Sequence, residues 1–353
     1  MGTADAGFLQ PRSATEVLKL GVAECIRAGG SVWVTVFAIM LAPTAIAVAG
    51  QYLIWRSGAG QLMESMRRGT LNPQTIVPAE LFGAIAIMAA VGLVSGILSL
   101  LAQYGSGVAV ARILAERALG RQFGPTLAWD FLIGKAWKII SGALAMVLIA
   151  GAAAIAGEIP GLIIGMAIGM SGGAMKPGAP PPPVTQIAPL VTMLPALVVA
   201  AVYLAPMMAV TGVEGPGGFT ALSRSFRLAS GQFRHILGVI ILAGLVFMTP
   251  SLVLAVLAQT SVAAHLRESM GAANGMLLLT GAGSVLSLLL SPFMLTVQAA
   301  IYFDLRSRQV DEPFTPHELA QDLGAESPAG VAPSAGGGSK APLPPPPPPS
   351  VMS

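Results

Sequence analysis

Six long apolar stretches, none with a charged side chain inside it, dominate this sequence. A helix needs roughly 20 mostly apolar residues to cross the hydrocarbon core of a bilayer. With 54% hydrophobic and only 10% charged residues, the chain has more apolar surface than one soluble globule can bury. We therefore predict an all-α protein, a polytopic membrane helical bundle with six transmembrane helices. The predicted spans are 32–54, 81–103, 139–156, 187–210, 236–258 and 277–303.

The distribution of Lys and Arg predicts how these spans are oriented. Most of the 19 basic residues lie in the N-terminal arm, the even-numbered connections and the C-terminal tail. Because short cytoplasmic segments are enriched in Lys and Arg, we expect both termini to be cytoplasmic. The basic residues that fall on the opposite side are Arg56, Arg67, Arg68, Lys176 and Arg267.

The third apolar stretch continues to about residue 175, which is longer than one straight span requires. Glu158 and Pro160 interrupt it, so a kinked long helix and a span followed by a short interfacial or re-entrant helix both fit. A seventh complete crossing would move the Arg-rich connection after span four to the outside, which the distribution of charge disfavours.

A glycine recurs at every fourth position in the second half of this stretch. Glycines at this spacing form one flat face of a helix, on which another backbone can approach closely. We expect the face to pack against span four, and a contact between two copies of the chain is the alternative. The glycines are Gly157, Gly161, Gly165, Gly169 and Gly173.

Amphipathic stretches precede spans one, three and five. They cover residues 16–30, 123–138 and 222–233, and in the last of them Leu222 and Phe226 begin a helical apolar stripe with arginines on the other face. This order predicts a threefold repeat of two-span units. The amphipathic helices would lie on the cytoplasmic surface, where Arg and Lys can hold anionic lipid headgroups.

The two ends of the chain differ from the rest in composition. We expect residues 1–12 to be a flexible N-terminus. Residues 309–353, rich in Pro, Gly and Ala, are predicted to be a disordered cytoplasmic tail with polyproline II character near its end. A docking role for the final proline run is the alternative.

The residues that usually carry chemistry are sparse and scattered. The chain has 1 cysteine, Cys25, and 3 histidines, which excludes an internal disulfide and provides no metal-ligand cluster. It has no phosphate-binding loop, no nucleophile elbow and no basic stripe for nucleic acid. The sequence predicts no catalytic residue, cofactor, metal site or nucleic-acid partner. Membrane lipids are the expected partners, together with a second copy or another membrane protein.

A set of charged residues at the cytoplasmic ends of the last spans forms the candidate site. Carboxylates and guanidinium groups at one depth can pair through charge-assisted hydrogen bonds. We expect a structural clasp that holds the third amphipathic helix against the bundle, with contact to an anionic lipid headgroup as the alternative. The residues are Glu214, Arg224, Arg227, Asp304 and Arg306.

Two motifs in the last third of the chain carry a family resemblance. Val213-Glu214 is followed by Ala-Leu-Ser-Arg-Ser-Phe-Arg-Leu-Ala-Ser-Gly at 221–231, and Tyr-Phe-Asp-Leu-Arg at 302–306 closes the last span. The chain resembles the glycerophosphoryl diester phosphodiesterase membrane-domain family and related bacterial six-span proteins over about residues 16–308. That module is sometimes fused to a soluble phosphodiesterase barrel. Nothing here matches the barrel's catalytic His and Glu, so the resemblance implies a stand-alone membrane module without enzymatic activity.

With this resemblance, the observations predict a non-catalytic, multi-pass integral membrane protein of the bacterial cytoplasmic (inner) membrane. It would serve as a scaffold or accessory module for lipid-linked or envelope processes. One alternative is a transporter or flippase-like carrier of a neutral or lipid substrate, which would need a polar cavity lined by kinked spans. The other is a membrane enzyme that acts on lipid headgroups, with Glu214 or Asp304 as its catalytic group.

Overall fold

The computed structural model describes residues 10–56, 78–171, 183–257, 269–270, 272–309 and 314–324, and every regular element in these ranges is an α-helix. The predicted all-α fold is thus confirmed. The helices are α1 (Ala14–Ala28), α2 (Gly30–Arg56), α4 (Pro78–Ala118), α5 (Pro125–Gly134), α6 (Ala136–Ser171), α7 (Pro183–Leu204), α8 (Met207–Val213), α9 (Gly218–Ala229), α10 (Phe233–Leu257), α12 (Ala272–Ser307) and α13 (Pro316–Gly324).

In the part of the chain that the structure describes, five stretches of helix are long and apolar enough to cross a membrane. They lie in α2, α4, α6, α12 and the run from Val191 to Val213 that joins α7 and α8. The pair α9 and α10, bent by 101°, makes a sixth if it is counted as one span. The predicted span 187–210 is divided because Pro206 disfavours helical backbone at the residue before it.

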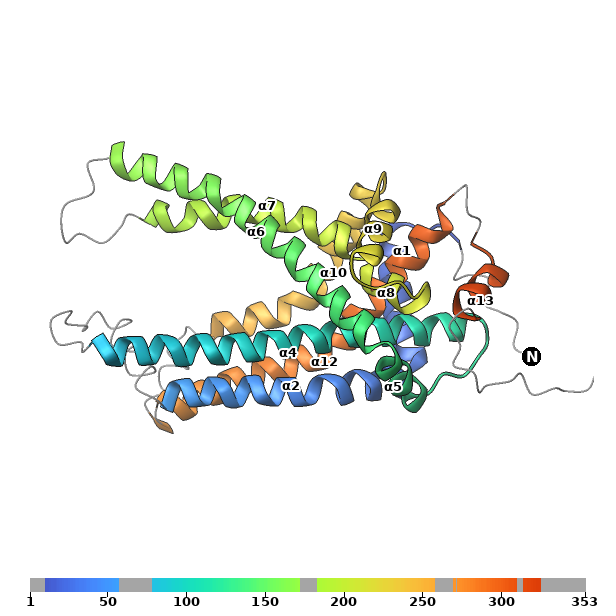
Figure 1. The fold of residues 1–353 in the computed structure, drawn as a ribbon, viewed down its shortest axis with the longest axis horizontal. Coiled ribbons are helices and arrows are strands. Elements are labelled where there is room, and N and C mark those ends of the chain that lie inside the picture. The colour runs from blue at the N-terminus through green and yellow to red at the C-terminus, as the bar shows by residue number, and fades with distance from the viewer. Residues whose placement is uncertain are drawn as a thin grey trace, which may run out of the picture.

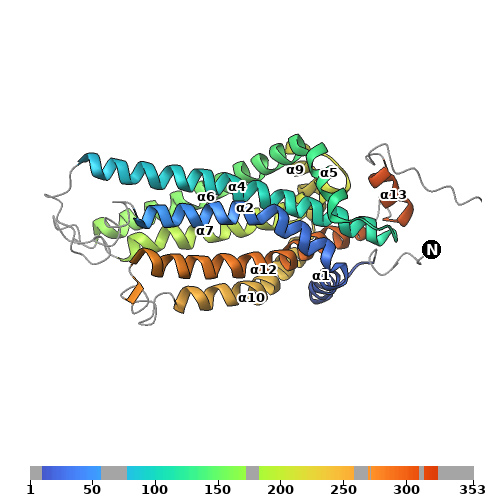
Figure 2. The same ribbon diagram turned by 90° about the horizontal axis from the view of Figure 1, so that it is seen from below.

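The helices form two arms that diverge from a common head (Figure 1). The hairpin arm consists of α6 and α7, and the four-helix arm consists of α2, α4, α10 and α12. The head contains α1, α5, α8, α9, α13 and the adjoining ends of the long helices. Figure 2 shows the long helices running side by side away from the head, with α13 at its far end.

Two long helices, α4 and α12, continue from the membrane into the head. Helix α4 has 41 residues and α12 has 36, which correspond to about 60 and 54 Å at about 1.5 Å per residue. A hydrocarbon core spans only about 30 Å. Their head ends bury Ile113 and Phe303 completely, whereas the outer half of α4 exposes Phe82 and Leu93. The packed core therefore lies in the head, and the arms present apolar side chains to lipid.

The region after residue 139 forms one continuous helix, α6, which extends to Ser171 and contains Pro160. Of the two conformations that the sequence allowed, the structure shows the long helix and not a span with a separate short helix. A Cβ on Gly157 would lie 2.7 Å from Cα of Met193, and one on Gly161 would lie 2.4 Å from Cα of Pro189. Both glycines thus face α7 within one chain.

The remaining glycines of this face are described less completely. Gly165 is buried and Gly169 belongs to α6, whereas Gly173 lies outside the described residues.

The expectation that residues 309–353 are entirely disordered is wrong for one segment. Pro316–Gly324 forms α13, in which Leu319 and Leu323 are 0% exposed, and Phe314 just before it is also buried. Leu319 and Leu323, four residues apart on one face of the helix, and Phe314 before it let this short segment pack on the head although its surroundings are rich in Pro and Ala. Residues 325–353, with the proline run, lie outside the described residues.

The expectation that residues 1–12 are flexible also needs a correction, at Arg12. The backbone N–H of Arg12 donates to Oδ1 of Asp304 at 2.6 Å, so the chain is already held against the head before α1 begins. Residues 1–9 lie outside the described part of the chain.

Candidate functional site

Glu214 lies at the centre of a polar cluster in the head, directly after α8. Its Oε2 accepts a hydrogen bond from Nε of Arg224 at 2.8 Å, and its Oε1 accepts one from the hydroxyl of Tyr302 at 3.0 Å. Nε of Arg306 lies 3.7 Å from the same Oε1. Through one carboxylate, α8 is therefore joined to α9 and to α12.

Asp304 belongs to a second cluster, although it is close to Arg306 in sequence. Its Oδ2 lies 2.8 Å from Nε2 of His235 on α10 and 2.8 Å from Nε of Arg308. With the bond from Arg12, this buried carboxylate joins the N-terminal segment, α10 and the end of α12.

The five predicted site residues thus do not form one site. Glu214, Arg224 and Arg306 come together, Asp304 lies in the other cluster, and Arg227 lies on the exposed face of α9. Sequence reasoning did not assign His235 to the site. The helical period could have shown that Asp304 and Arg306 belong to different clusters. Positions 302 and 306, four residues apart, share a face of α12, and position 304 does not lie on that face.

A third set of polar residues, which the sequence analysis also missed, fixes α13. Nη2 of Arg112 donates to the carbonyl of Leu323 at 3.1 Å and pairs with Glu116 at 2.8 Å. Nη2 of Arg306 lies 3.6 Å from Oδ2 of Asp322. The i, i+4 spacing of Arg112 and Glu116 was the available sequence signal.

The carboxyl of Asp322 is in an unfavourable place for a charge. Burial raises its pKa, the nearby Glu214 carboxylate raises it further, and the guanidinium of Arg306 opposes both effects. The docking of α13 therefore depends on the burial of Leu319 and Leu323 more than on this ion pair.

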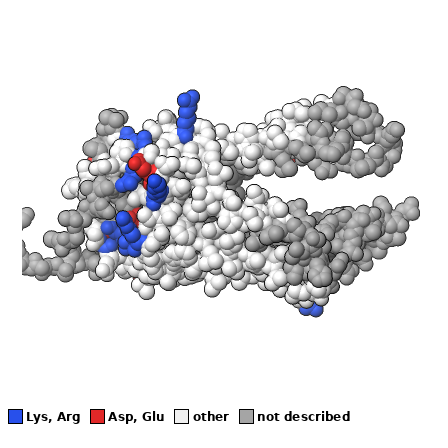
Figure 3. Space-filling view, turned by 180° about the vertical axis from the view of Figure 1, so that it is seen from behind, with Lys and Arg blue, Asp and Glu red and all other residues white. Residues whose placement is uncertain are grey.

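The charged side chains concentrate at one end of the molecule (Figure 3). Among the described residues, every Lys and Arg except Arg56 lies in the head. Within the same part of the chain, no group of three or more His, Cys, Asp or Glu residues could hold a metal ion. Glu214 and Asp304 instead accept hydrogen bonds from side chains of other helices, which suits a clasp.

A cavity of about 430 Å³ lies where the two arms meet the head. Side chains of α4, α6, α7, α8, α10 and α12 line it, and nearly all of them are apolar, such as Met146, Leu197 and Ile240. Pro195 of α7, Pro250 of α10 and Pro292 of α12 lie inside helices that contribute to this lining.

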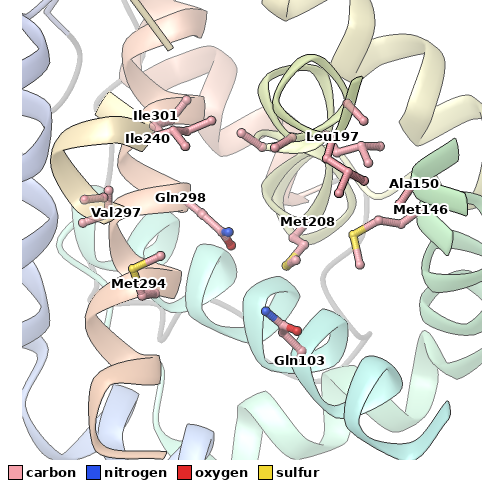
Figure 4. A pocket seen from close by; sticks show the side chains of 15 residues that line it. Gln103, Met146, Ala150, Leu197, Met208, Ile240, Met294, Val297, Gln298 and Ile301 are labelled. Atoms are coloured by element: carbon pink, nitrogen blue, oxygen red, sulfur yellow. The ribbon is translucent and has the colours of Figure 1, made fainter. Parts of the chain in front are cut away.

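Two glutamines provide the polar groups of the cavity. Gln103 of α4 and Gln298 of α12 point their amide ends into the same space (Figure 4). Oε1 of Gln298 is buried and has no hydrogen-bond partner among the described residues. A second cavity of about 120 Å³ shares both glutamines. The sequence analysis treated these residues only as parts of apolar spans, although an amide in such a span was a visible signal.

Comparisons with known proteins add no functional assignment. No protein-family model, curated protein or solved structure matches this chain. The resemblance carried by residues 213–231 and 302–306 therefore stays a prediction. In the structure, these two motifs supply Glu214, Arg224 and Arg306, the residues of the central polar cluster.

Proposed function

We propose that this chain is a non-catalytic membrane carrier that holds a lipid-like amphiphile between its two arms. The observation that supports this most directly is the cavity of about 430 Å³ at the junction of the arms. Its volume lies within the range of about 300–1,000 Å³ typical of small-molecule sites. Both arms and the head contribute to its walls, so a bound molecule would touch every part of the bundle.

The shape of the molecule gives an amphiphile access to this cavity. Figure 3 shows open space between the arms beside the head. Apolar side chains on the outer parts of both arms are exposed, among them Leu162 of α6 and Val94 of α4. In a bilayer, lipid chains would occupy such apolar space. An amphiphile could therefore reach the cavity from the membrane without crossing water.

The contacts of the acidic residues support the non-catalytic part of the proposal. A general acid or base needs access to a substrate, but Asp304 is 2% exposed and already bound by three different groups. Glu214 is bound by Arg224 and Tyr302. Both carboxylates are thus committed to holding helices together, which argues against an enzyme that uses them.

The proposal includes a definite topology. We take α10 as the sixth crossing, and the head, with its Lys and Arg residues, as the cytoplasmic end in a bacterial inner membrane. The helix order places a short helix, α1, α5 or α9, before each of three pairs of long helices. This order supports three related two-span units.

A variant that fills the cavity tests the proposal. Ala201 lines the cavity and is exposed within it, so Ala201→Phe should occupy the site without disturbing the packing. Ala152→Phe, on an exposed face of α6, is the matched control. We expect lipid that co-purifies in mild detergent, measured by native mass spectrometry, to fall about tenfold in Ala201→Phe alone. Equal amounts of bound lipid in the two variants would rule out a carrier site here.

A scaffold or accessory module remains the second candidate, and the interlocked head favours it. Hydrogen bonds and ion pairs join the N-terminal segment, α8, α9, α10, α12 and α13 into one unit, which could serve as a platform for a membrane protein partner or a second copy. Absence of bound lipid, together with a stoichiometric protein partner in the same purification, would favour this candidate.

A further inference from the structure

We infer that the ligand of this cavity carries an uncharged, hydrogen-bonding headgroup, which Gln103 and Gln298 recognise. The inference rests on the proposed carrier function and specifies its substrate class. A diacylglycerol-like lipid has this chemistry: a hydroxyl that both donates and accepts, and two apolar chains.

The lining of the cavity selects against charge. None of the described residues around it is ionisable. A phosphate or an ammonium group buried there would lose its hydration without gaining a counter-charge, which is strongly unfavourable. An anionic lipid would instead be held at the surface of the head, where the Lys and Arg residues lie.

The two carboxamides provide the complementary groups. Each amide offers an acceptor oxygen and two N–H donors, and both point into the same space (Figure 4). The buried carbonyl oxygen Oε1 of Gln298 has no donor among the described residues. Because a buried acceptor without a donor is unfavourable, a ligand hydroxyl placed there would satisfy it.

The position of the amides matches the orientation of a lipid in the leaflet next to the head. Gln298 lies one helical turn before Tyr302, whose hydroxyl donates to Glu214 in the head. Gln103 lies directly before Tyr104, which bonds Thr211 of α8. A headgroup at the amides would therefore sit at the narrow end of the space between the arms. Its chains would extend away from the head, between apolar side chains of both arms.

Photolabelling of the full-length protein in phosphatidylcholine nanodiscs tests this inference. Two probes with the same diazirine-bearing acyl chain are compared, an uncharged diacylglycerol and an anionic phosphatidylglycerol. We expect the diacylglycerol to label cavity-lining residues at least fivefold more than the anionic probe. Gln298→Leu and Gln103→Leu should each lower this labelling five- to tenfold, the effect of losing a hydrogen bond to a neutral ligand.

Gln51→Leu, on an exposed face of α2 away from the cavity, is the matched control and should label as wild type does. Gln298→Leu removes a buried oxygen without a partner, so its thermal stability should be equal to or above that of wild type. Loss of labelling without loss of stability separates recognition from a merely structural role.

The outcomes distinguish this inference from the proposed function. Equal labelling by both probes, preference for the anionic probe, or undiminished labelling of Gln298→Leu, as expected if a water molecule satisfies the carbonyl, would overturn the inference and leave the carrier function standing. If neither probe labels cavity-lining residues above the lipid-exposed outer arms, the proposed function itself is wrong.

Discussion

Single carboxylates hold the head of this protein together, each by contacts to several helices. Glu214 is bound by Arg224, Tyr302 and Arg306, and the side chains of this cluster are largely buried. Removing one member of a buried ion pair leaves its partners with uncompensated charge, which lowers the free energy of unfolding. This loss is larger than the stability that the ion pair adds compared with apolar side chains in its place. The effect of a substitution here should therefore appear in stability.

Replacing Glu214 by Gln should lower the free energy of unfolding by on the order of 2 kcal/mol, between the values for exposed and fully buried pairs. The amide N–H₂ would face donors, Arg224 would lose the carboxylate to which it donates, and Arg306 would keep only Asp322 of its two acidic neighbours. Thermal unfolding in detergent measures this, and Asp304→Asn should lose a comparable amount. Loss of an enzymatic activity with unchanged unfolding temperature in either variant would contradict the clasp.

Asp322 provides the matched control, because it also lies near Arg306 but its pKa is raised from the usual 3.8. A carboxyl with a raised pKa in the folded protein favours folding most when it is protonated. Its stabilising effect is complete below 3.8 and is lost as the pH rises through the raised value. Asp322→Asn should therefore leave the unfolding temperature at pH 7 unchanged or slightly higher.

The hairpin arm depends on close packing of two helix backbones. Gly161 of α6 lies so near Pro189 and Thr192 of α7 that a Cβ would overlap both residues. Gly151, on the same helix, has nothing within 4 Å of the position of a Cβ. The same substitution should thus have opposite effects at the two sites.

Gly161→Ala should destabilise the protein by about 1–3 kcal/mol through overpacking. Gly151→Ala should leave it unchanged or stabilise it by up to about 1 kcal/mol through helix propensity. Thermal unfolding of the two variants in the same detergent compares them directly. Equal stability would mean that α6 and α7 do not pack closely along this face.

The whole molecule has two chemically different ends, one with nearly all of the described Lys and Arg residues and one with Arg56. This asymmetry underlies the proposal that the head is cytoplasmic. The native cysteine does not complicate labelling experiments, because Cys25 is 0% exposed and burial raises the pKa of its thiol.

Labelling with a membrane-impermeant maleimide should distinguish the two ends. In intact spheroplasts, Arg56→Cys should react at once, whereas Arg227→Cys should react only after permeabilisation. Wild type, with buried Cys25 alone, should stay unlabelled in both cases, since the reactive thiolate is disfavoured. Labelling of Arg227→Cys in intact spheroplasts would reverse the topology.

The amino-acid sequence alone predicted which segments are helical and apolar, because both properties depend on residues close together in the chain. It also indicated the glycine face of α6 and the basic ends of the spans. Different helices lie beside the different faces of α12. This arrangement separates Asp304 from Glu214 and places Asp304 against His235.

What lies between the helices depends on contacts between distant segments of the chain. Helix α13 has too few apolar residues to stand out in a Pro-rich tail, and it forms because the head offers a surface that buries Leu319 and Leu323. The cavity exists because α6 and α7 diverge from the other long helices, which brings Gln103 and Gln298 to one space. Such contacts join residues far apart in the chain, and local periodicity does not encode them.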